Sequence, residues 1–285
     1  MDVCNIEQIK ALLARHGFHF SKSMGQNFLV QSWVPEDIAA ASQICADHCV
    51  LEIGPGIGPL TRQLSDRAGK VVAVELDKTL LPILNETLEG RNNVTIIPGD
   101  IMKLDIPALV REMFQGLTPA ACANLPYNIT SPVITALIQA NCFESITVMI
   151  QREVALRICA SPGTSDYGSF SVFCQYYTKP ELLFDVPNTC FIPAPKVTSS
   201  VLRMTPAPKP KDVVDESFFF RVVRASFAQR RKTLHNSLSS SLGAPFTREM
   251  IAKAIQSCAL PSDIRGERLG IPEFIALSNT LFAMN

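Results

Sequence analysis

The pattern of apolar and polar positions divides this chain into parts. Between residues 48 and 150, short apolar runs alternate with segments whose apolar residues recur at helical spacing. Short apolar runs predict buried strands, and this alternation predicts a mostly parallel sheet covered by helices. The expected strands span residues 48–53, 71–74, 94–97, 119–123 and 146–150. The expected helices between them include residues 60–68 and 80–88.

The pattern differs on both sides of this region. Two amphipathic helices are expected before it, at residues 6–14 and 32–45, and the polar stretch 19–29 between them is typical of a linker. After it, residues 169–177 predict a helix, and residues 181–186 and 197–204 predict strands. Because no full crossover helix separates these two strands, we expect an antiparallel hairpin at the edge of the sheet.

Residues 205–211, Thr-Pro-Ala-Pro-Lys-Pro-Lys, have the composition of a linker. All later apolar periodicity is helical, with helices expected at 217–228, 232–242, 247–254 and 271–282. The patterns therefore predict an α/β domain over residues 1–206, with a seven-stranded, mostly parallel sheet, and a small all-helical domain over residues 207–285.

Composition narrows the class of protein. The 285-residue chain is 47% hydrophobic and 18% charged, which is typical of a globular protein. It has no apolar run long enough for a membrane span, for which about 18 residues are needed, and its first residues lack the pattern of a secretory signal. We therefore expect a cytoplasmic protein without a membrane partner.

The nine cysteines argue against disulfides and a metal site, and the charge balance argues against attraction of nucleic acid by the whole protein. No Cys-x-x-Cys pair occurs and most cysteines lie in apolar runs, so we expect reduced thiols and no bound metal. Lysine plus arginine equal aspartate plus glutamate, at 26 each. Any binding of nucleic acid must therefore depend on a local basic patch.

Three successive expected strands end in residues that suit a nucleotide-like ligand. The first leads into a turn containing Gly54, Gly56 and Gly58, the second ends at Glu75, and the third leads to Asp100. The turn lacks the Gly-x-Gly-x-x-Gly dinucleotide fingerprint. Glu75 can accept hydrogen bonds from ribose hydroxyls, as in sites for NAD and for S-adenosylmethionine, so it does not choose between them. Asp100 can accept from an adenine amino group, although each acid alone could equally be a cap or turn residue.

The fourth expected strand leads into Asn124-Leu125-Pro126-Tyr127. Pro126 restricts the backbone of the residue before it, so the Leu125 carbonyl is held in an extended geometry. This carbonyl and the Asn124 amide oxygen could converge on one amino group, and Tyr127 offers a flat face to a base. An ordinary strand-to-helix turn would have a similar composition. On its own, this segment is more typical of such a turn than of a site for an aromatic amine.

Further segments complete a set that closely resembles a known family. The shared segments are Gln26-Asn27-Phe28-Leu29, Glu52–Gly58, Glu75-Leu76-Asp77, Gly99-Asp100, Asn124–Ile129, Phe191–Ser199 and Phe227–Leu234. Together they resemble the ribosomal RNA adenine dimethyltransferases, in order and over nearly the whole chain. The agreement is with the bacterial small-subunit members of that family.

The resemblance implies a Rossmann-like class I methyltransferase fold and S-adenosylmethionine as methyl donor. The implied reaction dimethylates N6 of two adjacent adenosines in the 3′-terminal hairpin loop of 16S ribosomal RNA, with a role in small-subunit biogenesis. The implied donor site consists of Asn27, Leu29, Gly54, Gly56, Glu75, Asp100 and Asn124, under a lid formed by residues 19–29. The implied catalytic residues are Asn124, Leu125, Pro126, Tyr127 and Phe191, with the acceptor adenine between Tyr127 and Phe191.

Residues 221–232 contain several basic residues and no acid. The candidate RNA-binding residues are Arg221, Arg224, Arg230, Arg231 and Lys232, and Lys22, Arg152 and Lys196 could extend this set. If residues 217–240 form one helix, Arg224 and Arg231 share a face that could hold phosphates.

Other functions remain open at this stage. An antibiotic-resistance methylase of large-subunit RNA shares the motifs, and a DNA adenine methylase uses a related one. A ribosome-assembly factor that binds immature subunits, with methylation secondary, and a dehydrogenase are further alternatives. We expect a monomer.

Overall fold

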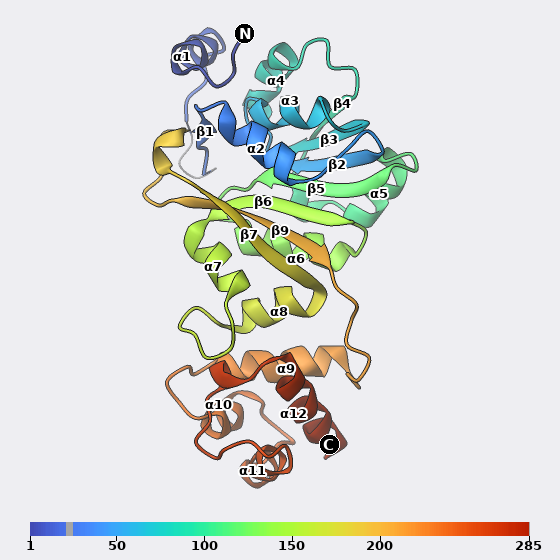
Figure 1. The fold of residues 1–285 in the computed structure, drawn as a ribbon, viewed down its shortest axis with the longest axis vertical. Helices are drawn as coiled ribbons and strands as arrows, with labels where there is room; N and C mark the ends of the chain where they lie inside the picture. Colours follow the sequence, from blue (N-terminus) through green and yellow to red (C-terminus); the bar gives the residue numbers. More distant parts are fainter. Residues whose placement is uncertain (21–24, 285) are drawn as a thin grey trace. The chain divides into compact units, whose positions relative to one another are not determined.

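The computed structural model describes residues 1–20 and 25–284 (Figure 1). The strands are β1 (Phe28–Leu29), β2 (His48–Ile53), β3 (Lys70–Glu75), β4 (Val94–Pro98), β5 (Thr118–Asn124), β6 (Ser145–Gln151), β7 (Thr178–Val186), β8 (Phe191–Ile192) and β9 (Ser199–Pro206). The α-helices are α1 (Ile6–Arg15), α2 (Trp33–Ala41), α3 (Pro59–Ser65), α4 (Leu81–Thr87), α5 (Ile106–Met113), α6 (Thr130–Ala140), α7 (Arg152–Cys159), α8 (Ser169–Tyr177), α9 (Glu216–Phe227), α10 (Leu234–Ser241), α11 (Arg248–Ser257) and α12 (Ile271–Ala283). Short 3₁₀ turns are η2 (Lys78–Leu80), η3 (Ile101–Lys103), η4 (Asn188–Cys190) and η5 (Gly266–Arg268).

The main sheet has seven strands in the order β4-β3-β2-β5-β6-β9-β7. The pairs from β4 to β6 are parallel, and β9 runs antiparallel to β6. In Figure 1, α2 lies on the near face of this sheet and α6 on the far face. The predicted α/β fold, with a mostly parallel sheet and an antiparallel edge, is confirmed. The strand order reverses between β2 and β5, which is where open α/β sheets bind ligands.

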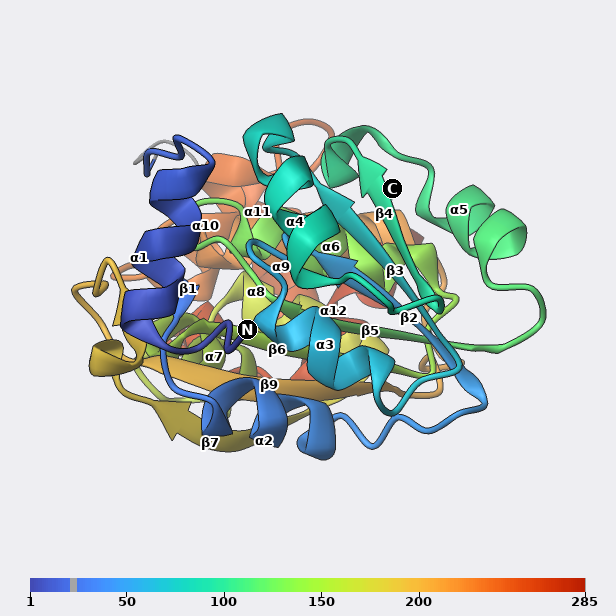
Figure 2. The same cartoon turned by 90° about the horizontal axis from the view of Figure 1, so that it is seen from above.

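A second, two-stranded sheet was not predicted from sequence. β1 pairs antiparallel with β8, so that Phe28 lies opposite Ile192 and Leu29 opposite Phe191. Helix α1 packs on β1 through a buried cluster that includes Leu12, Leu13 and Phe28 (Figure 2). Residues 25–29, which the polar composition suggested to be a linker, therefore end in a buried strand.

The chain forms two compact units, residues 1–155 with 180–206, and residues 156–179 with 207–285. The second unit includes residues 156–179, which the predicted division at residue 206 assigned to the α/β part. Helix α8 explains this difference, because its aromatic side chains pack on those of α9. The rings of Tyr176 and Phe219 are 5.0 Å apart, and those of Phe173 and Phe220 are 5.6 Å apart.

Candidate active site

The carboxyl ends of β2, β3, β4 and β5 border one cavity. Its volume is about 1140 Å³, including space open to solvent at its mouth. Every residue predicted for the donor and acceptor sites lines it, namely Asn27, Leu29, Gly54, Gly56, Glu75, Asp100, Asn124, Leu125, Pro126, Tyr127 and Phe191. The structure therefore brings these residues together, while the role of each stays a prediction.

The turn after β2 allows close approach to its backbone. Gly56 has φ of +63°, a conformation that favours glycine, and a Cβ atom there would lie 3.3 Å from the Phe28 ring. A side chain at this position would therefore press on β1 and narrow the cavity. The glycine keeps both the turn and the space in front of it.

Glu75 is the last residue of β3, and its carboxylate accepts two hydrogen bonds from the backbone. Its Oε2 accepts from the Gly56 N–H at 3.2 Å, and its Oε1 accepts from the Asp77 N–H at 2.8 Å. These bonds fix the carboxylate at the cavity wall, and each oxygen keeps a further lone pair for a ligand hydroxyl. Burial raises the pKa of Glu75, while the bonds from Asp77 and Gly56 act in the opposite direction.

Asp100 performs the capping role that its sequence context allowed, and it also faces the cavity. Its Oδ1 accepts from the Met102 N–H at 3.0 Å, and its Oδ2 lies 3.8 Å from the Lys103 ammonium. Apolar side chains flank these rim acids, because Leu76 and Ile101 line the same cavity and Leu76 is 48% exposed. The sequence reasoning gave these two residues no role.

Glu52 belongs to one of the shared segments, but no catalytic or binding role was predicted for it. It lines the cavity, is 1% exposed, and its Oε2 has no hydrogen-bond partner among the described residues. Burial raises the pKa of Glu52 to about 8, with Thr61 opposing this effect and the Glu75 charge adding to it. The available signal was an acid inside an otherwise apolar strand, which marks a charge that the fold must bury at a cost.

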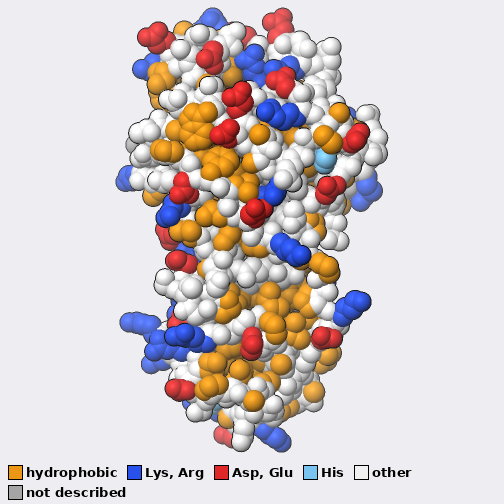
Figure 3. Space-filling model, viewed as in Figure 1, with side chains coloured by type: hydrophobic (Ala, Val, Ile, Leu, Met, Phe, Trp, Pro, Cys, Tyr) orange, Lys and Arg blue, Asp and Glu red, His pale blue; other side chains and the backbone are white. Residues whose placement is uncertain are grey.

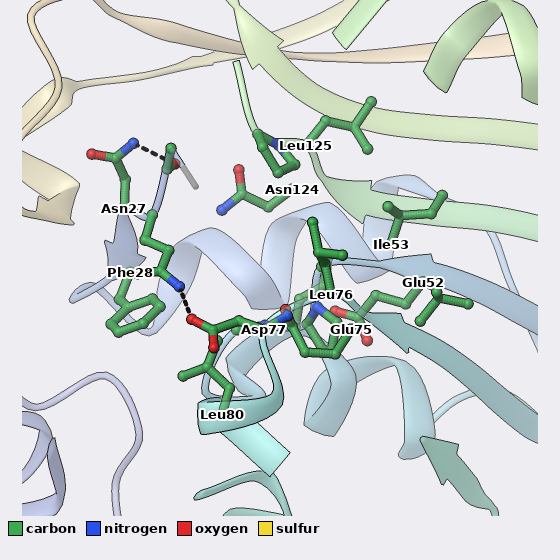
Figure 4. Close-up of a pocket in the computed structure, with 18 of the residues that line it drawn as sticks. Asn27, Phe28, Glu52, Ile53, Glu75, Leu76, Asp77, Leu80, Asn124 and Leu125 are labelled. Atoms are coloured by element: carbon green, nitrogen blue, oxygen red, sulfur yellow. Dashed lines mark hydrogen bonds between the residues drawn. The ribbon is translucent and has the colours of Figure 1, made fainter. Parts of the chain in front are cut away.

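Asn124 ends β5 with its side chain projecting toward the segment that carries Asn27 and Phe28 (Figure 4). Across the part of the chain that the structure describes, its amide and the Leu125 carbonyl have no hydrogen-bond partner. The Leu125 N–H is used, because it donates to the Met149 carbonyl at 3.1 Å. A polar side chain and a carbonyl are thus left available beside the cavity.

The two predicted aromatic residues lie in different surroundings. The Tyr127 hydroxyl is 2.6 Å from the Ser199 Oγ. Phe191 is only 4% exposed and belongs to a buried cluster that includes Leu29 and Cys190. Phe191 therefore supports the core as well as lining the cavity, and its role in stacking a base stays a prediction.

Residues 25–29 cross from one wall of the cavity to another. A Cβ atom on Gly25 would lie 3.2 Å from the Asn128 Oδ1, and the Gln26 Nε2 donates to the Asp77 Oδ2 at 2.6 Å (Figure 4). Asn27 donates from its Nδ2 to the Gly25 carbonyl at 3.1 Å. The predicted lid spans 19–29, of which residues 21–24 lie outside the described residues. Of its described residues, 25–29 line the cavity, whereas His19 and Phe20 do not.

The predicted basic residues divide into two groups. Arg221 donates to the Leu242 carbonyl, and Arg230 donates to the carbonyls of Ser165 and Tyr167, so these two help to hold their own unit together. The side chains of Arg224, Arg231 and Lys232 are exposed and have no ion-pair or hydrogen-bond partner in the described ranges. Figure 3 shows lysine and arginine side chains gathered on one side of this unit.

The two helices expected at 217–228 and 232–242 are confirmed, but the condition that residues 217–240 form one helix is not met. Helix α9 ends at Phe227 and α10 begins at Leu234, so Arg224 and Arg231 do not share a helix face. Of the residues suggested to extend the patch, Lys22 lies outside the described residues, and Arg152 pairs with Asp185 at 2.9 Å. Lys196 is exposed.

Two features are absent from the described residues. No group of three or more His, Cys, Asp or Glu side chains there could hold a metal ion. No helix in residues 1–20 or 25–284 has the length and apolar character needed to cross a membrane.

Comparisons with known proteins agree with this geometry. A ribosomal RNA adenine dimethylase family model matches residues 17–267. The chain is 45% identical to ribosomal RNA small subunit methyltransferase A from Bacillus mycoides (strain KBAB4), over 98% of this chain and 97% of that protein. The protein of the same name from Bacillus anthracis (strain CDC 684) gives the same identity and coverage.

Solved structures give the same fold. A dimethyladenosine transferase from Plasmodium falciparum aligns with a TM-score of 0.72 and 25% identity, covering 87% of this chain and 95% of that one. The 23S rRNA methyltransferase ErmE aligns with a TM-score of 0.64 and 24% identity over 90% of this chain and 99% of that one, which shows the fold alone. Since the family model spans most of the chain and full-length relatives share nearly half of its residues, the chain belongs to the ribosomal RNA adenine dimethylase family.

Proposed function

We propose that this chain dimethylates the N6 amino groups of two adjacent adenosines in the 3′-terminal hairpin loop of 16S ribosomal RNA, with S-adenosylmethionine as methyl donor. Its substrate would be the small ribosomal subunit or its precursor, and we expect it to act as a monomer in the cytoplasm. The observation that carries the proposal is a pair of acceptors beside Tyr127 at the cavity, the Asn124 amide oxygen and the Leu125 carbonyl, which have no hydrogen-bond partner within residues 1–20 and 25–284.

The chain's residues fit the donor at the opposite wall of the cavity. The Gly56 backbone allows close approach, and the Glu75 carboxylate, already fixed by two backbone N–H groups, would accept the ribose hydroxyls. Asp100 would accept from the adenine amino group, with Leu76 and Ile101 against the apolar ring. When bound, S-adenosylmethionine supplies a methyl carbon made electrophilic by the adjacent sulfonium.

The acceptor side would position a weak nucleophile. The amino lone pair of adenine is delocalised into its ring, and hydrogen bonds from its two hydrogens to Asn124 and Leu125 would favour the charge that develops on nitrogen. As the new nitrogen–carbon bond forms, the carbon–sulfur bond breaks and its electron pair stays on sulfur. The methylated amine then releases its proton to water, so this step needs no general base from the chain. A second transfer to the same nitrogen requires a fresh donor.

The target adenine must leave the RNA stack to reach the cavity. The faces of Tyr127 and Phe191 would replace the lost stacking, which is worth about 1–3 kcal/mol per base. Arg224, Arg231 and Lys232 would bind backbone phosphates, because their charges are exposed and are not committed to partners in the described part of the chain. Arg221 and Arg230 would contribute less, since each already donates to backbone carbonyls.

The decisive experiment is methyl transfer from labelled donor to purified small subunits that lack the modification, followed by nucleoside analysis. Label is expected in N6,N6-dimethyladenosine at two neighbouring positions. Label only in large subunits, or only in methylcytidine, would contradict the proposal, and the first result would favour an antibiotic-resistance type of methylase.

Ligand-dependent stability separates the proposal from a dehydrogenase. A ligand that binds only the folded state raises the unfolding temperature by mass action. We expect protection by S-adenosylmethionine and by its demethylated product, and none by NAD. A role in subunit assembly is compatible with catalysis, and a catalytically inactive Asn124→Ala variant that still binds immature subunits would reveal it.

A further inference from the structure

Tyr127 is held from behind by a residue outside the predicted site. Its hydroxyl lies 2.6 Å from the Oγ of Ser199, which is 0% exposed and does not line the cavity. Burial raises the pKa of Tyr127, and the hydrogen bond with Ser199 acts against that effect. The hydroxyl is thus committed inside the protein, and only the ring of Tyr127 is left to meet a ligand.

The position of Ser199 is itself fixed by the main sheet. It is the first residue of β9 and lies opposite Gln151 in the antiparallel pair with β6. The carbonyl of the preceding Thr198 accepts from the Arg152 N–H at 3.0 Å. Because Thr198 and Ser199 are both held against the end of β6, the serine hydroxyl has a defined location, and its bond can define where the tyrosine ring lies.

The same stretch of chain carries the second ring of the acceptor site. Phe191 lies eight positions before Ser199 in the sequence, and the intervening loop is closed by a bond from Asn188 Nδ2 to the Pro195 carbonyl at 3.1 Å. Phe191 is also anchored by its pairing with Leu29 in the small sheet. One segment therefore holds Phe191 at one end and Tyr127, through Ser199, at the other.

We propose that Ser199 is a positioning residue for the acceptor base. Its hydrogen bond fixes the Tyr127 ring relative to Phe191, and so sets the gap into which a planar base must fit. This inference rests on the proposed function, because it assigns a purpose to a site whose acceptor is itself proposed. Ser199 acts through Tyr127 and touches neither the donor nor the base.

The test compares four variants in the methyl-transfer assay. Tyr127→Phe and Ser199→Ala each remove the same hydrogen bond from opposite sides, and the double variant removes nothing more. Ser200→Ala is the matched control, because Ser200 is the next residue, is also 0% exposed, and bonds to Asp185 at 2.6 Å. It therefore loses a part-buried hydrogen bond of the same length that does not involve Tyr127.

We expect Tyr127→Phe and Ser199→Ala to lower kcat/KM for the RNA by about two- to tenfold, as for loss of one hydrogen bond. The double variant should match the single variants, and the Kd for S-adenosylmethionine should stay at its wild-type value. Ser200→Ala should keep wild-type kcat/KM even where its unfolding temperature falls. Should Ser199→Ala not fold, Tyr127→Phe decides alone.

Three results would overturn the inference. They are wild-type kcat/KM in Tyr127→Phe, additive losses in the double variant, and an equal loss of kcat/KM in Ser200→Ala. Asn124→Ala separates this failure from that of the proposed function. If Asn124→Ala is inactive while Tyr127→Phe and Ser199→Ala behave as wild type, only the role of Ser199 is wrong; if Asn124→Ala keeps full transfer, the proposed catalytic site is wrong.

Discussion

At the scale of single residues, Asn124 is the most exacting test of the site, because its amide has no hydrogen-bond partner among the described residues to explain its presence. We predict that Asn124→Ala lowers the rate of methyl transfer by about 10²- to 10³-fold, the usual loss when one preorganised polar contact to a developing charge is removed. The measurement is the single-turnover rate on unmodified small subunits.

The control for this prediction is Asn92→Ala, which removes the same side chain from an exposed position away from the cavity. This control should keep the wild-type rate. A rate within threefold of wild type in Asn124→Ala would mean that the amide does not act on the substrate, and the proposed catalytic site would then be wrong.

Glu52 allows a prediction about stability and pH. Its pKa rises from 4.5 to about 8 on folding, so between these values the folded protein keeps a proton that the unfolded chain has lost. The free energy of unfolding contributed by this group therefore falls as pH rises through this window. We predict that Glu52→Gln increases the free energy of unfolding, and that its advantage over wild type grows from pH 5 to pH 8.

The slope of this difference cannot exceed about 1.4 kcal/mol per pH unit, the limit for one proton. Urea unfolding of both proteins without ligand at several pH values measures it. Glu89→Gln, at an exposed position, should show no such trend. An advantage that is constant with pH would mean that Glu52 is ionised in the folded protein throughout this range.

At the scale of elements, local pattern predicted most helices and strands of the main sheet. Helix α8 was expected at residues 169–177 and lies at Ser169–Tyr177. Helices α5 and α7 were missed, although α5 has an Asp105 cap that accepts from the Ala108 N–H at 2.9 Å. Pairing of β1 with β8 could not be predicted, because two-residue strands carry almost no periodicity and their register depends on distant packing.

The site shows the same division between local and distant information. Residues at strand ends, such as Glu75 and Asn124, were predictable because parallel strands bring their carboxyl ends to one edge. Ser199 and the Gln26–Asp77 bond were not, because each joins segments far apart in sequence. Glu52 had a local signal, an acid in an apolar strand, which the sequence reasoning did not use.

The segment formed by residues 25–29 gives a prediction at this scale. Gln26 joins it to the Glu75–Asp77 rim through the bond to Asp77. We predict that Gln26→Ala raises the Kd for S-adenosylmethionine by about two- to tenfold, because loss of one hydrogen bond loosens the cover of the donor site. Calorimetric titration measures this, and Gln31→Ala, at an exposed position shortly after β1, is the control. An unchanged Kd would show that β1 alone holds the segment.

At the scale of the whole molecule, the formal net charge is zero, so attraction to RNA cannot come from the protein's overall charge. Affinity must depend on where the uncommitted cations lie. The sequence indicated a basic stretch. It could not show which of its side chains bond within their own compact unit and which are available to bind RNA. The structure makes this distinction within residues 221–232. The side chains of Arg221 and Arg230 donate to backbone carbonyls, whereas those of Arg224, Arg231 and Lys232 have no partner in the described part of the chain.

This distinction predicts a change in salt dependence. Each phosphate contact made by a cation releases counterions, so log affinity falls with log salt by about 0.7–0.9 per contact. We predict that replacing Arg224, Arg231 and Lys232 by glutamine lowers this slope by about two, and weakens binding most at low salt. The measurement is the Kd for a fragment of the small-subunit RNA at several salt concentrations.

The control replaces three exposed cations elsewhere, Lys10, Arg111 and Lys253. It removes the same charge and should leave the slope within about half a unit of wild type. Equal slopes for the two triple variants would mean that RNA responds only to net charge, and the assignment of these three residues to phosphate binding would then be wrong.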